Sequence, residues 1–392
     1  MSSHDRYSIP VLILGTGVTV LGVMRCLGRK RIPLYCLSEG LESEARSRWC
    51  RRLSQEIGGF AKISELEQIL ESTPIREAVL IACSDHWTIE SARLSAPLKD
   101  RFHSCSPDPE VVGKFVNKGA FAELVETVDV PHPFTEIVGT EQDVIGLLKQ
   151  SAGQLFLKPA DSQRFHAAFG VKALRFDDME GTLSSFRRAR EAGLDMLVQE
   201  YIPGPPDHHY FVDGYVDRRH RLYACFARRR IRMFPPDFGN STCMISVPLR
   251  DVTGAVDTLE TLFEATGYSG IFSAEFKLDE RDGQFKILEM NCRPWWYIQF
   301  AAECGVDVAE MAYRDALEMP LPKVGVYKTG ARFVFPYYDR YALRDMHRRG
   351  KPVLKEFASS WIGAATPVFS WDDPLPAVSN FVDRVVKKLS LR

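Results

Sequence analysis

The sequence contains the segment Phe272-Ser-Ala-Glu275-Phe-Lys-Leu278, which runs through Asp282-Gly283 into Lys286-Ile-Leu-Glu289-Met-Asn291-Cys-Arg293-Pro294. Two strand-like runs on either side of an Asp-Gly pair predict a β-hairpin. Side chains alternate along a strand, so Glu289, Asn291 and Arg293 are expected on one face. A loop with an odd number of residues centred on Asp282 would place Glu275 directly opposite Glu289 on that face.

This hairpin carries the residues expected of a metal and phosphate site. Two carboxylates opposed across strands repel each other, so a sequence that specifies them needs a compensating cation. Carboxylate and amide oxygens are hard ligands that suit Mg²⁺ held jointly by protein and phosphate oxygens, and Arg293 offers a planar fork for a phosphate. The alternative is a solvated outer face of an exposed hairpin, but apolar neighbours such as Phe272, Phe276 and Ile287 favour a half-buried sheet.

Length and composition limit the class of protein. At about 150 residues per domain, 392 residues suggest two or three domains. A hydrophobic content of 45% and a charged content of 26% exclude a disordered or collagen-like chain. The formal net charge of −1 argues against a general nucleic-acid or membrane-surface field. Nine scattered cysteines without a Cys-x-x-Cys pair indicate a reducing compartment, and we expect a cytoplasmic protein.

The first hundred residues are typical of a parallel α/β sheet. Val11–Leu14 is expected to be a buried strand, followed by a glycine turn, a helix over Val18–Gly28 and a strand over Ile32–Leu37. A second unit has a strand over Ala78–Cys83 and a helix from Trp87 to Leu94. Ligands bind at the carboxyl ends of such strands. The weak candidates for substrate contacts there are Gly15, Thr16, Gly17, Ser84 and Asp85.

The glycine turn has two interpretations. Gly15-x-Gly17 is an incomplete dinucleotide fingerprint, because Val20 occupies the third glycine position. A purely structural tight turn is an equal alternative. The most apolar stretch of the chain, Val11 to Gly28, is interrupted by these glycines, by Gly22 and by Arg25, so neither a signal peptide nor a membrane span is expected.

The rest of the chain is less regular. A boundary is expected at Ser106–Pro109 and an antiparallel sheet over Tyr210–Ser246. After Lys323 we expect short strands and a closing helix near Val378–Leu389. The other expected helices are Val116–Val128, Thr182–Ala192, Val256–Thr266 and Val306–Leu317, and the other expected strands are Leu155–Leu157 and Met196–Glu200.

With these residues in order, residues 5 to 320 resemble the ATP-grasp superfamily. Lys118, in Asn117-Lys-Gly-Ala-Phe, and Lys158, in Leu155-Phe-Leu-Lys-Pro, look like the two lysines that reach the nucleotide phosphates. Glu200-Tyr201-Ile202 looks like the hinge strand, whose carbonyl at Glu200 and amide at Ile202 would bind adenine. Asp207 is the best-placed acid for the ribose hydroxyls. The resemblance assigns Glu275, Glu289 and Asn291 as magnesium ligands and Arg293, with Lys158, as catalytic.

The resemblance implies an α/β fold that becomes α+β in the later domains. It divides the chain into a Rossmann-like pre-ATP-grasp domain (1–106), a small ATP-grasp lobe (107–192), a large lobe with the metal hairpin (193–322) and a carboxy-terminal extension (323–392). In one respect the sequence departs from the family pattern. The loop at 161–170, commonly glycine-rich, has one glycine here, and Arg164 or His166 could act as a side-chain donor.

An arginine-rich strand supplies further candidates. Arg228, Arg230 and Arg232 alternate with Arg229 and Ile231, so the first three share a face. Arg228 and Arg230 could bind the γ-phosphate or a substrate carboxylate, whose geometry an arginine fork matches. A solvated sheet face is an equal alternative, whereas a nucleic-acid patch is disfavoured by the scarcity of aromatic residues and the neutral net charge.

The leading functional hypothesis is an ADP-forming ligase that uses ATP with Mg²⁺, or with Mn²⁺ in its place. Among the family branches, the chain is most similar to the carboxylate–amine ligases related to D-aspartate ligase. This implies an acyl-phosphate intermediate, small-molecule carboxylate and amine substrates of which one is an amino acid, no nucleic-acid or membrane partner, and a monomer or homodimer. Two alternatives are a nicotinamide-dependent oxidoreductase that uses the amino-terminal glycine turn and a non-catalytic nucleotide- or RNA-binding protein.

Overall fold

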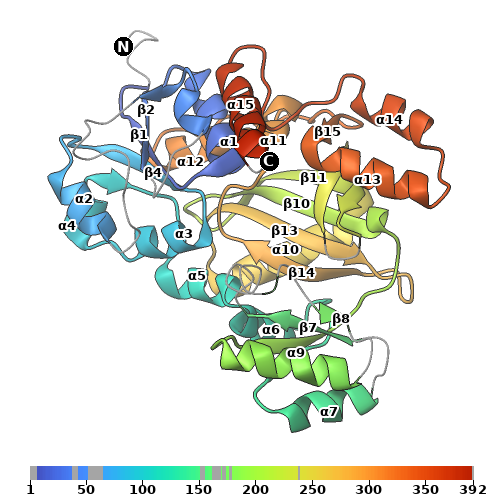
Figure 1. The fold of residues 1–392 in the computed structure, drawn as a ribbon. Helices are drawn as coiled ribbons and strands as arrows, with labels where there is room; N and C mark the ends of the chain where they lie inside the picture. Colours follow the sequence, from blue (N-terminus) through green and yellow to red (C-terminus); the bar gives the residue numbers. More distant parts are fainter. Residues whose placement is uncertain are drawn as a thin grey trace.

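The computed structural model describes residues 7–37, 43–51, 65–150, 155–160, 169, 174–175, 179–236 and 239–390. Three sheets follow one another along the chain (Figure 1). The first is parallel, the second has four strands and the third is a six-stranded antiparallel sheet at the centre of the molecule. The mixed α/β fold class predicted from the sequence is therefore confirmed.

The amino-terminal sheet has the strand order β3-β2-β1-β4-β5. Its central strands β1 (Val11–Leu14) and β4 (Ala78–Ala82) are parallel neighbours and fully buried, as expected of a sheet covered on both faces. Their carboxyl ends therefore meet at one edge of the sheet. The remaining elements of this part are β2 (Leu34–Leu37), β3 (Cys50–Arg51), β5 (Phe102–His103), α1 (Gly17–Gly28), α2 (Leu66–Ser72), α3 (Asp85–Ala92) and α4 (Ala96–Lys99).

The four-stranded sheet has the order β6-β9-β7-β8 and packs against α7 (Glu141–Gln150) and α9 (Met179–Glu191). Its strands are β6 (Thr135–Val138), β7 (Leu155–Pro159), β8 (Leu174–Arg175) and β9 (Met196–Glu200). β9 pairs with both β6 and β7. These hydrogen bonds favour placing the boundary between the small and large lobes after Glu200 rather than at 192, and the domain division stays a prediction.

The six-stranded sheet has the order β14-β13-β10-β11-β12-β15. One face packs against α5 (Pro109–Val116), α6 (Lys118–Thr127) and α10 (Thr253–Thr266). The opposite face contributes Phe211, Phe226 and Ile271 to a core shared with α11 (Ile298–Cys304) and α12 (Val308–Ala316). The strands are β10 (His209–Val216), β11 (Leu222–Phe234), β12 (Asn240–Val247), β13 (Gly270–Leu278), β14 (Phe285–Asn291) and β15 (Arg332–Val334).

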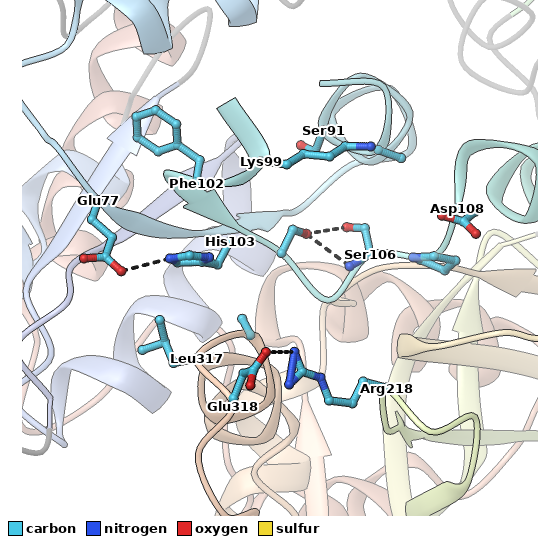
Figure 2. Close-up of a pocket in the computed structure, with 14 residues that line it drawn as sticks. Glu77, Ser91, Lys99, Phe102, His103, Ser106, Asp108, Arg218, Leu317 and Glu318 are labelled. Atoms are coloured by element: carbon cyan, nitrogen blue, oxygen red, sulfur yellow. Dashed lines mark hydrogen bonds and ion pairs between the residues drawn. The ribbon is translucent and has the colours of Figure 1, made fainter. Parts of the chain in front are cut away.

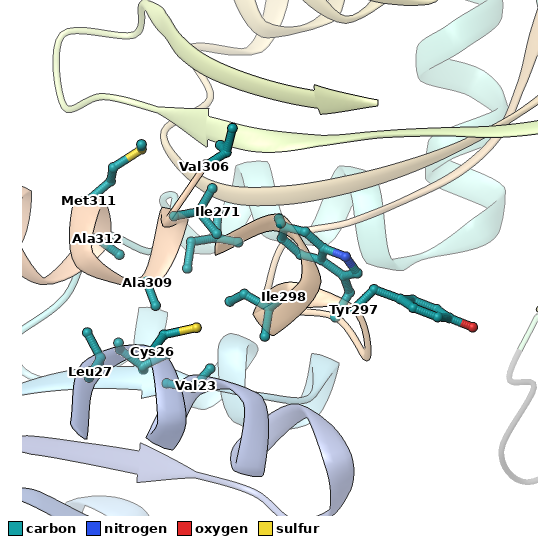
Figure 3. Close-up of a cluster of buried hydrophobic side chains, with 14 of the residues drawn as sticks. Val23, Cys26, Leu27, Ile271, Tyr297, Ile298, Val306, Ala309, Met311 and Ala312 are labelled. Atoms are coloured by element: carbon teal, nitrogen blue, oxygen red, sulfur yellow. The ribbon is translucent and has the colours of Figure 1, made fainter. Parts of the chain in front are cut away.

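This shared core joins the amino-terminal sheet to the central one. Val23, Cys26 and Leu27 of α1 lie against Ile298 of α11 and against α12, as Figure 3 shows. Gly22 permits the close approach of the two helices, because a Cβ there would lie 2.8 Å from Ile298 Cγ2. Close packing of this kind resists deformation, so the core fixes α1 relative to the segment that follows β14.

The carboxy-terminal extension returns to the amino-terminal sheet. It comprises α13 (Pro336–Arg348), α14 (Val353–Trp361) and α15 (Leu375–Ser390), with β15 before them (Figure 1). Residues 367–373 lie over α1, where the fully buried Arg25 bonds the Asp373 carboxylate and the carbonyls of Pro367 and Val368. Asp373 also accepts hydrogen bonds from the Ser47 hydroxyl and the Arg48 amide. This buried network anchors the end of the chain to its beginning.

Several expected helices are confirmed with small changes of their bounds, and the structure adds helices that the sequence did not predict. The helix expected over Val116–Val128 is α6, which begins at Lys118 because Asn117 caps it by accepting bonds from two amide groups, and a separate helix, α5, ends at Val116. The helix expected over Val306–Leu317 is α12, and the unpredicted α11 precedes it. The closing helix expected near Val378–Leu389 is α15, but the preceding part of the extension contains β15 and two helices, α13 and α14, where only short strands were expected. None of the helices in the described part of the chain combines the length and apolarity needed to cross a membrane.

Candidate active site

The hairpin register predicted from the sequence is confirmed. Glu275 of β13 pairs directly with Glu289 of β14, and Ser273 pairs with Asn291. The cause differs from the expected odd-numbered loop. Pairs near the turn, such as Leu278 with Phe285, are offset by one residue, and a bulge at Leu288 restores the opposition of the two glutamates. Bulges re-aim side chains next to functional sites, and this one sets the two carboxylates against each other.

Glu275 is held by two groups from neighbouring strands. Its Oε1 accepts hydrogen bonds from Arg230 Nη2 and His209 Nδ1, both at 2.8 Å. Burial and the charge of Arg230 lower the pKa of His209 to about 4, against the opposing effect of Glu275. His209 is therefore a neutral donor at pH 7. His209 lies on β10, between β13 and β11, so it occupies an interior strand of the sheet.

The arginine strand is buried, which rules out the solvated-face alternative. Arg228 and Arg230 have 2% and 4% of their surface exposed. Arg228 bonds Asp213 through Nε at 2.6 Å and Nη2 at 3.2 Å, while Phe211 and Tyr297 cover the faces of its guanidinium. Arg230 bonds Ser241 as well as Glu275. Of the two predicted substrate arginines, Arg230 thus contacts the hairpin carboxylate of Glu275 directly. Arg228 instead contacts Asp213, on the neighbouring strand β10.

Arg232, the third arginine on that face, bonds residues of the carboxy-terminal extension instead. Arg232 forms two hydrogen bonds with Asp339 of α13, at 2.9 and 2.7 Å, and a third with Ser360 of α14. Asp339 also accepts from Thr242 and from the indole of Trp361. One strand therefore places Arg230 at the hairpin and Arg232 in a structural network.

Arg293 joins the hairpin to the amino-terminal sheet. Its Nε and Nη2 contact the two carboxylate oxygens of Asp85 at 2.7 and 3.2 Å, and Nη2 also donates to Asn291 Oδ1 at 3.0 Å. Burial lowers the pKa of Arg293, but the charges of Asp85 and Glu289 outweigh it and the net shift is upward. The predicted catalytic arginine, a predicted metal ligand and a predicted substrate residue are thus in one contact group.

The donor set fits a hard divalent cation bound together with a polyphosphate. Glu275, Glu289 and Asn291 present carboxylate and amide oxygens on the same face of the hairpin, and Mg²⁺ takes such ligands with substrate oxygens completing its shell. Within the described ranges, no group of three or more His, Cys, Asp or Glu side chains forms a complete metal cage. The arrangement therefore suits an ion that the nucleotide helps to hold.

The two predicted phosphate lysines lie at the same end of β7. Lys118, the first residue of α6, donates from Nζ to the Pro159 carbonyl at 3.0 Å. Lys158 precedes that proline, and its Nζ contacts Gln199 Oε1 at 3.4 Å. Helix α6 and strand β7 thus bring together two cations that are 40 positions apart in sequence.

The predicted adenine-binding segment, residues 200–202, begins at the end of β9 in the four-stranded sheet. Glu200 ends β9, and Ile202 just beyond it is buried. Lys277 Nζ lies 4.6 Å from the centre of the Tyr201 ring, and Arg281, in the hairpin turn, bonds Glu200 at 2.6 Å. The hairpin therefore contacts this strand directly.

Asp207, the predicted ribose acid, lies in the short 3₁₀ helix Pro206–His208 with about half of its side chain exposed. Its Oδ2 is 3.7 Å from Arg229 Nη1. Arg229 thus points away from the buried arginines of its strand.

The amino-terminal candidates divide into two groups. Gly15 and Gly17 have positive φ angles of 123° and 84°, which explains glycine at both ends of the turn, and Thr16 between them is exposed. Ser84 uses its hydroxyl to cap α3 by accepting a bond from the Trp87 amide. The turn glycines and the Ser84 cap are explained by the local structure. Of the five amino-terminal candidates, Asp85 contacts the hairpin segment, through Arg293.

Other features lie apart from this group. The Cys292 thiol is buried in the core, and burial raises its pKa. Figure 2 shows a pocket of about 530 Å³ near His103, Asp108, Arg218 and Glu318, and none of the predicted site residues lines it. Arg164 and His166 of the loop at 161–170 lie outside the described residues.

Sequence reasoning missed three residues of the site. His209 and Arg281 bond the residues predicted for metal and nucleotide, and Lys277 covers Tyr201. The alternation of β13 places Lys277 and Glu275 on one face, which was a usable signal. His209 had no comparable signal, because its partner is 66 residues away.

Comparison with known proteins agrees with this geometry. No protein-family model matches the chain. The chain is 26% identical over 332 residues to a D-aspartate ligase of Enterococcus faecium (strain Aus0004), which covers 80% of this chain and 78% of the relative. This similarity agrees with the resemblance to the ATP-grasp superfamily that the sequence motifs predict.

Solved structures share the ATP-grasp fold at low sequence identity. The biotin carboxylase domain of the Hydrogenobacter thermophilus 2-oxoglutarate carboxylase, in complex with MgADP, ADP and bicarbonate, has a TM-score of 0.61 at 15% identity, over 82% of this chain and 73% of that one. The L-amino acid ligase of Bacillus licheniformis has a TM-score of 0.59 at 12% identity, over 80% and 75%. The ATP-grasp ligase class and the use of ATP with Mg²⁺, predicted from the sequence, agree with these relatives.

Proposed function

We propose that the protein is an ATP-dependent carboxylate–amine ligase that forms an amide or peptide bond through an acyl-phosphate and releases ADP and phosphate. A substrate carboxylate oxygen attacks the γ-phosphorus of ATP, and ADP leaves. The amine then attacks the acyl carbon, phosphate leaves, and the surplus amine proton passes to solvent. The names of the D-aspartate ligase and the L-amino acid ligase support an amino acid as one substrate.

The position of each residue supports a role in this reaction. Lys118 and Lys158 would neutralise the phosphates at the end of β7, and residues 200–202 with Asp207 would bind the nucleoside. Glu275, Glu289 and Asn291 would hold Mg²⁺, which would screen the charge of the phosphate oxygens. Arg293 stabilises the transferring group, because fixed cations around oxygens supply most of the catalysis in phosphoryl transfer.

The observation that carries this proposal is the direct opposition of Glu275 and Glu289 next to Asn291 and Arg293. Two opposed carboxylates need a cation between them. Arg230 and His209 bond Glu275, whereas Arg293 affects Glu289 only through its charge. A metal ion shared with a polyphosphate satisfies both carboxylates.

Thermal unfolding tests nucleotide use before any substrate is known. Wild type and Glu289→Gln are melted with Mg-ATP, with ATP plus a chelator, and with NADPH. A ligand at 100 times its dissociation constant adds about 2.7 kcal/mol of stability, so a shift in midpoint is readily measured. We expect Mg-ATP alone to stabilise the wild type and the Glu289→Gln change to weaken the effect.

The control is Glu90→Gln on the exposed side of α3, which should respond as wild type does. Stabilisation by NADPH without Mg-ATP would contradict the proposal and favour an oxidoreductase. Mg-ATP binding without ADP release across a panel of amino-acid pairs that includes D-aspartate would favour a non-catalytic nucleotide-binding protein.

A further inference from the structure

The contact between Asp85 and Arg293 uses the side of the guanidinium that a phosphate or carboxylate substrate would occupy. Bidentate recognition employs Nε and one Nη, and Asp85 takes this pair at 2.7 and 3.2 Å. Arg293 and Asp85 have 20% and 31% of their side chains exposed. The pair is therefore sheltered but lies at the border of the site.

The hydrogen bonds of Arg293 occupy four of its five N–H groups. Arginine has five N–H groups. Nε donates to Asp85, the two hydrogens of Nη2 face Asp85 and Asn291, and one hydrogen of Nη1 faces the Pro294 carbonyl at 3.2 Å. One Nη1 hydrogen remains without an acceptor among the described residues. Arg293 thus has a single N–H to offer, and its direction is set by the groups that hold the other four.

Asp85 itself is rigidly placed. It is the first residue of α3, which follows β4 after two residues, and the Ser84 hydroxyl caps that helix. The core between α1 and α11, with Gly22 against Ile298, fixes the amino-terminal sheet relative to the chain that follows Arg293. A carboxylate held in this way can orient a partner to within the small tolerance that catalysis requires.

We propose that Asp85 is a positioning residue that holds Arg293 side-on, so that Arg293 directs one Nη1 hydrogen at the transferring phosphoryl group. The amino-terminal sheet then contributes to phosphoryl transfer through Asp85, in addition to any substrate contact. This inference rests on the proposed ligase function. It concerns the orientation of the arginine and predicts no effect on binding of the ground-state nucleotide.

Binding of fluoroaluminate tests the inference without knowledge of the substrates. Fluoroaluminate with MgADP mimics a phosphoryl group in transfer, so a site preorganised for that group binds the ternary combination more tightly than MgADP alone. Calorimetry measures both affinities for wild type, Asp85→Asn, Arg293→Ala, the double variant and Glu90→Gln. Glu90 lies on the same helix as Asp85, and among the residues that the structure describes its carboxylate bonds Arg93, so it is the matched control.

We expect MgADP affinity to remain within about twofold of wild type in Asp85→Asn, and the gain from fluoroaluminate to fall by about 10- to 100-fold. Arg293→Ala should lose the same gain, and adding Asp85→Asn to it should have no further effect, because residues that act as a unit are not additive. A merely structural role would lower both affinities together. Thermal melts identify any variant that fails to fold, and Asp85→Glu, which keeps the carboxylate, should recover part of the gain.

Two results separate the inference from the function. If Asp85→Asn keeps the full fluoroaluminate gain, or still reduces it in the Arg293→Ala background, the positioning role is overturned while the ligase proposal stands. If the wild type binds MgADP without any gain from fluoroaluminate, phosphoryl transfer at this site is contradicted, and the inference fails with it.

Discussion

Among the Arg–Asp pairs that connect the amino-terminal part to later parts of the chain, Arg25–Asp373 and Arg293–Asp85 differ in burial. Arg25 and Asp373 have 0% and 1% of their side chains exposed, and carbonyls, an amide and hydroxyl groups surround them. Arg293 and Asp85 are partly accessible, and Arg293 retains one N–H. The comparison teaches that a saturated, buried pair stabilises the fold, whereas a sheltered pair at a border can serve a reaction.

The largest effect is expected from the buried pair. Arg25→Met leaves Asp373 as an uncompensated buried charge, and removal of one partner from such a pair costs about 3–5 kcal/mol. Urea denaturation of the two proteins measures the difference in the free energy of unfolding. A loss below about 1 kcal/mol would contradict the view that this network anchors the extension.

Arg293→Ala is expected to lower the activity strongly and the stability only slightly. Loss of a preorganised donor to the transferring group lowers the rate of ADP formation by about 100-fold or more. The free energy of unfolding should change by only about 1 kcal/mol, because Asp85 regains contact with water. Steady-state rates and urea denaturation on the same preparation decide this, and a destabilised variant with normal turnover would show that the two pairs are alike.

His209 is expected to make the stability of the protein depend on pH. Its pKa is about 4 in the folded chain, below the unperturbed value of about 6.5, so the unfolded chain binds more protons between these values. Stability should therefore fall as pH decreases from about 6.5 to 4, by up to about 3 kcal/mol. His209→Gln should flatten this part of the stability profile. An unchanged slope in the variant would assign the dependence to other groups.

The smallest effect is expected beside the buried pair, at Asp372. Its hydrogen bonds with Arg29 outweigh partial burial and hold the pKa of Asp372 below its usual range. The stabilisation is present above about pH 4, the unfolded value, and is lost as pH falls through the folded value. Because 40% of the side chain is exposed, Asp372→Asn should cost less than about 1 kcal/mol at pH 7. A loss comparable to that of Arg25→Met would remove burial as the deciding factor.

The elements whose apolar residues form a clear pattern in the sequence were predictable. The apolar run Val11–Leu14 is a strand with the predicted bounds, as is Met196–Glu200, and the Asp-Gly pair does mark the hairpin turn. The start of a helix was less predictable from periodicity. The helix expected from Val116 begins at Lys118, and the role of Asn117 as its cap is visible only in the bonds that Asn117 accepts from the first turn.

In the site, alternation along β14 predicted which residues share a face, and the opposed glutamates were predicted without the bulge that produces them. Burial of the arginine strand could not be predicted, because the acids that neutralise Arg228 and Arg232 are 15 and 107 residues away. The Asp85–Arg293 contact spans 208 residues, and the packing of α1 on α11, together with that of α3 and β14 on α5, brings the two together. Local patterns give faces and turns, whereas charge partners are set by tertiary structure.

The most direct test of the account is trapping of the acyl-phosphate. Hydroxylamine is added to the protein with Mg-ATP and a carboxylate, such as D-aspartate, but without the amine, and hydroxamate, ADP and AMP are quantified. The account predicts one hydroxamate for each ADP, dependent on Mg²⁺ and on the carboxylate, and absent in Glu289→Gln. Hydroxamate accompanied by AMP, or ADP release that is independent of every carboxylate in an amino-acid panel, would contradict it.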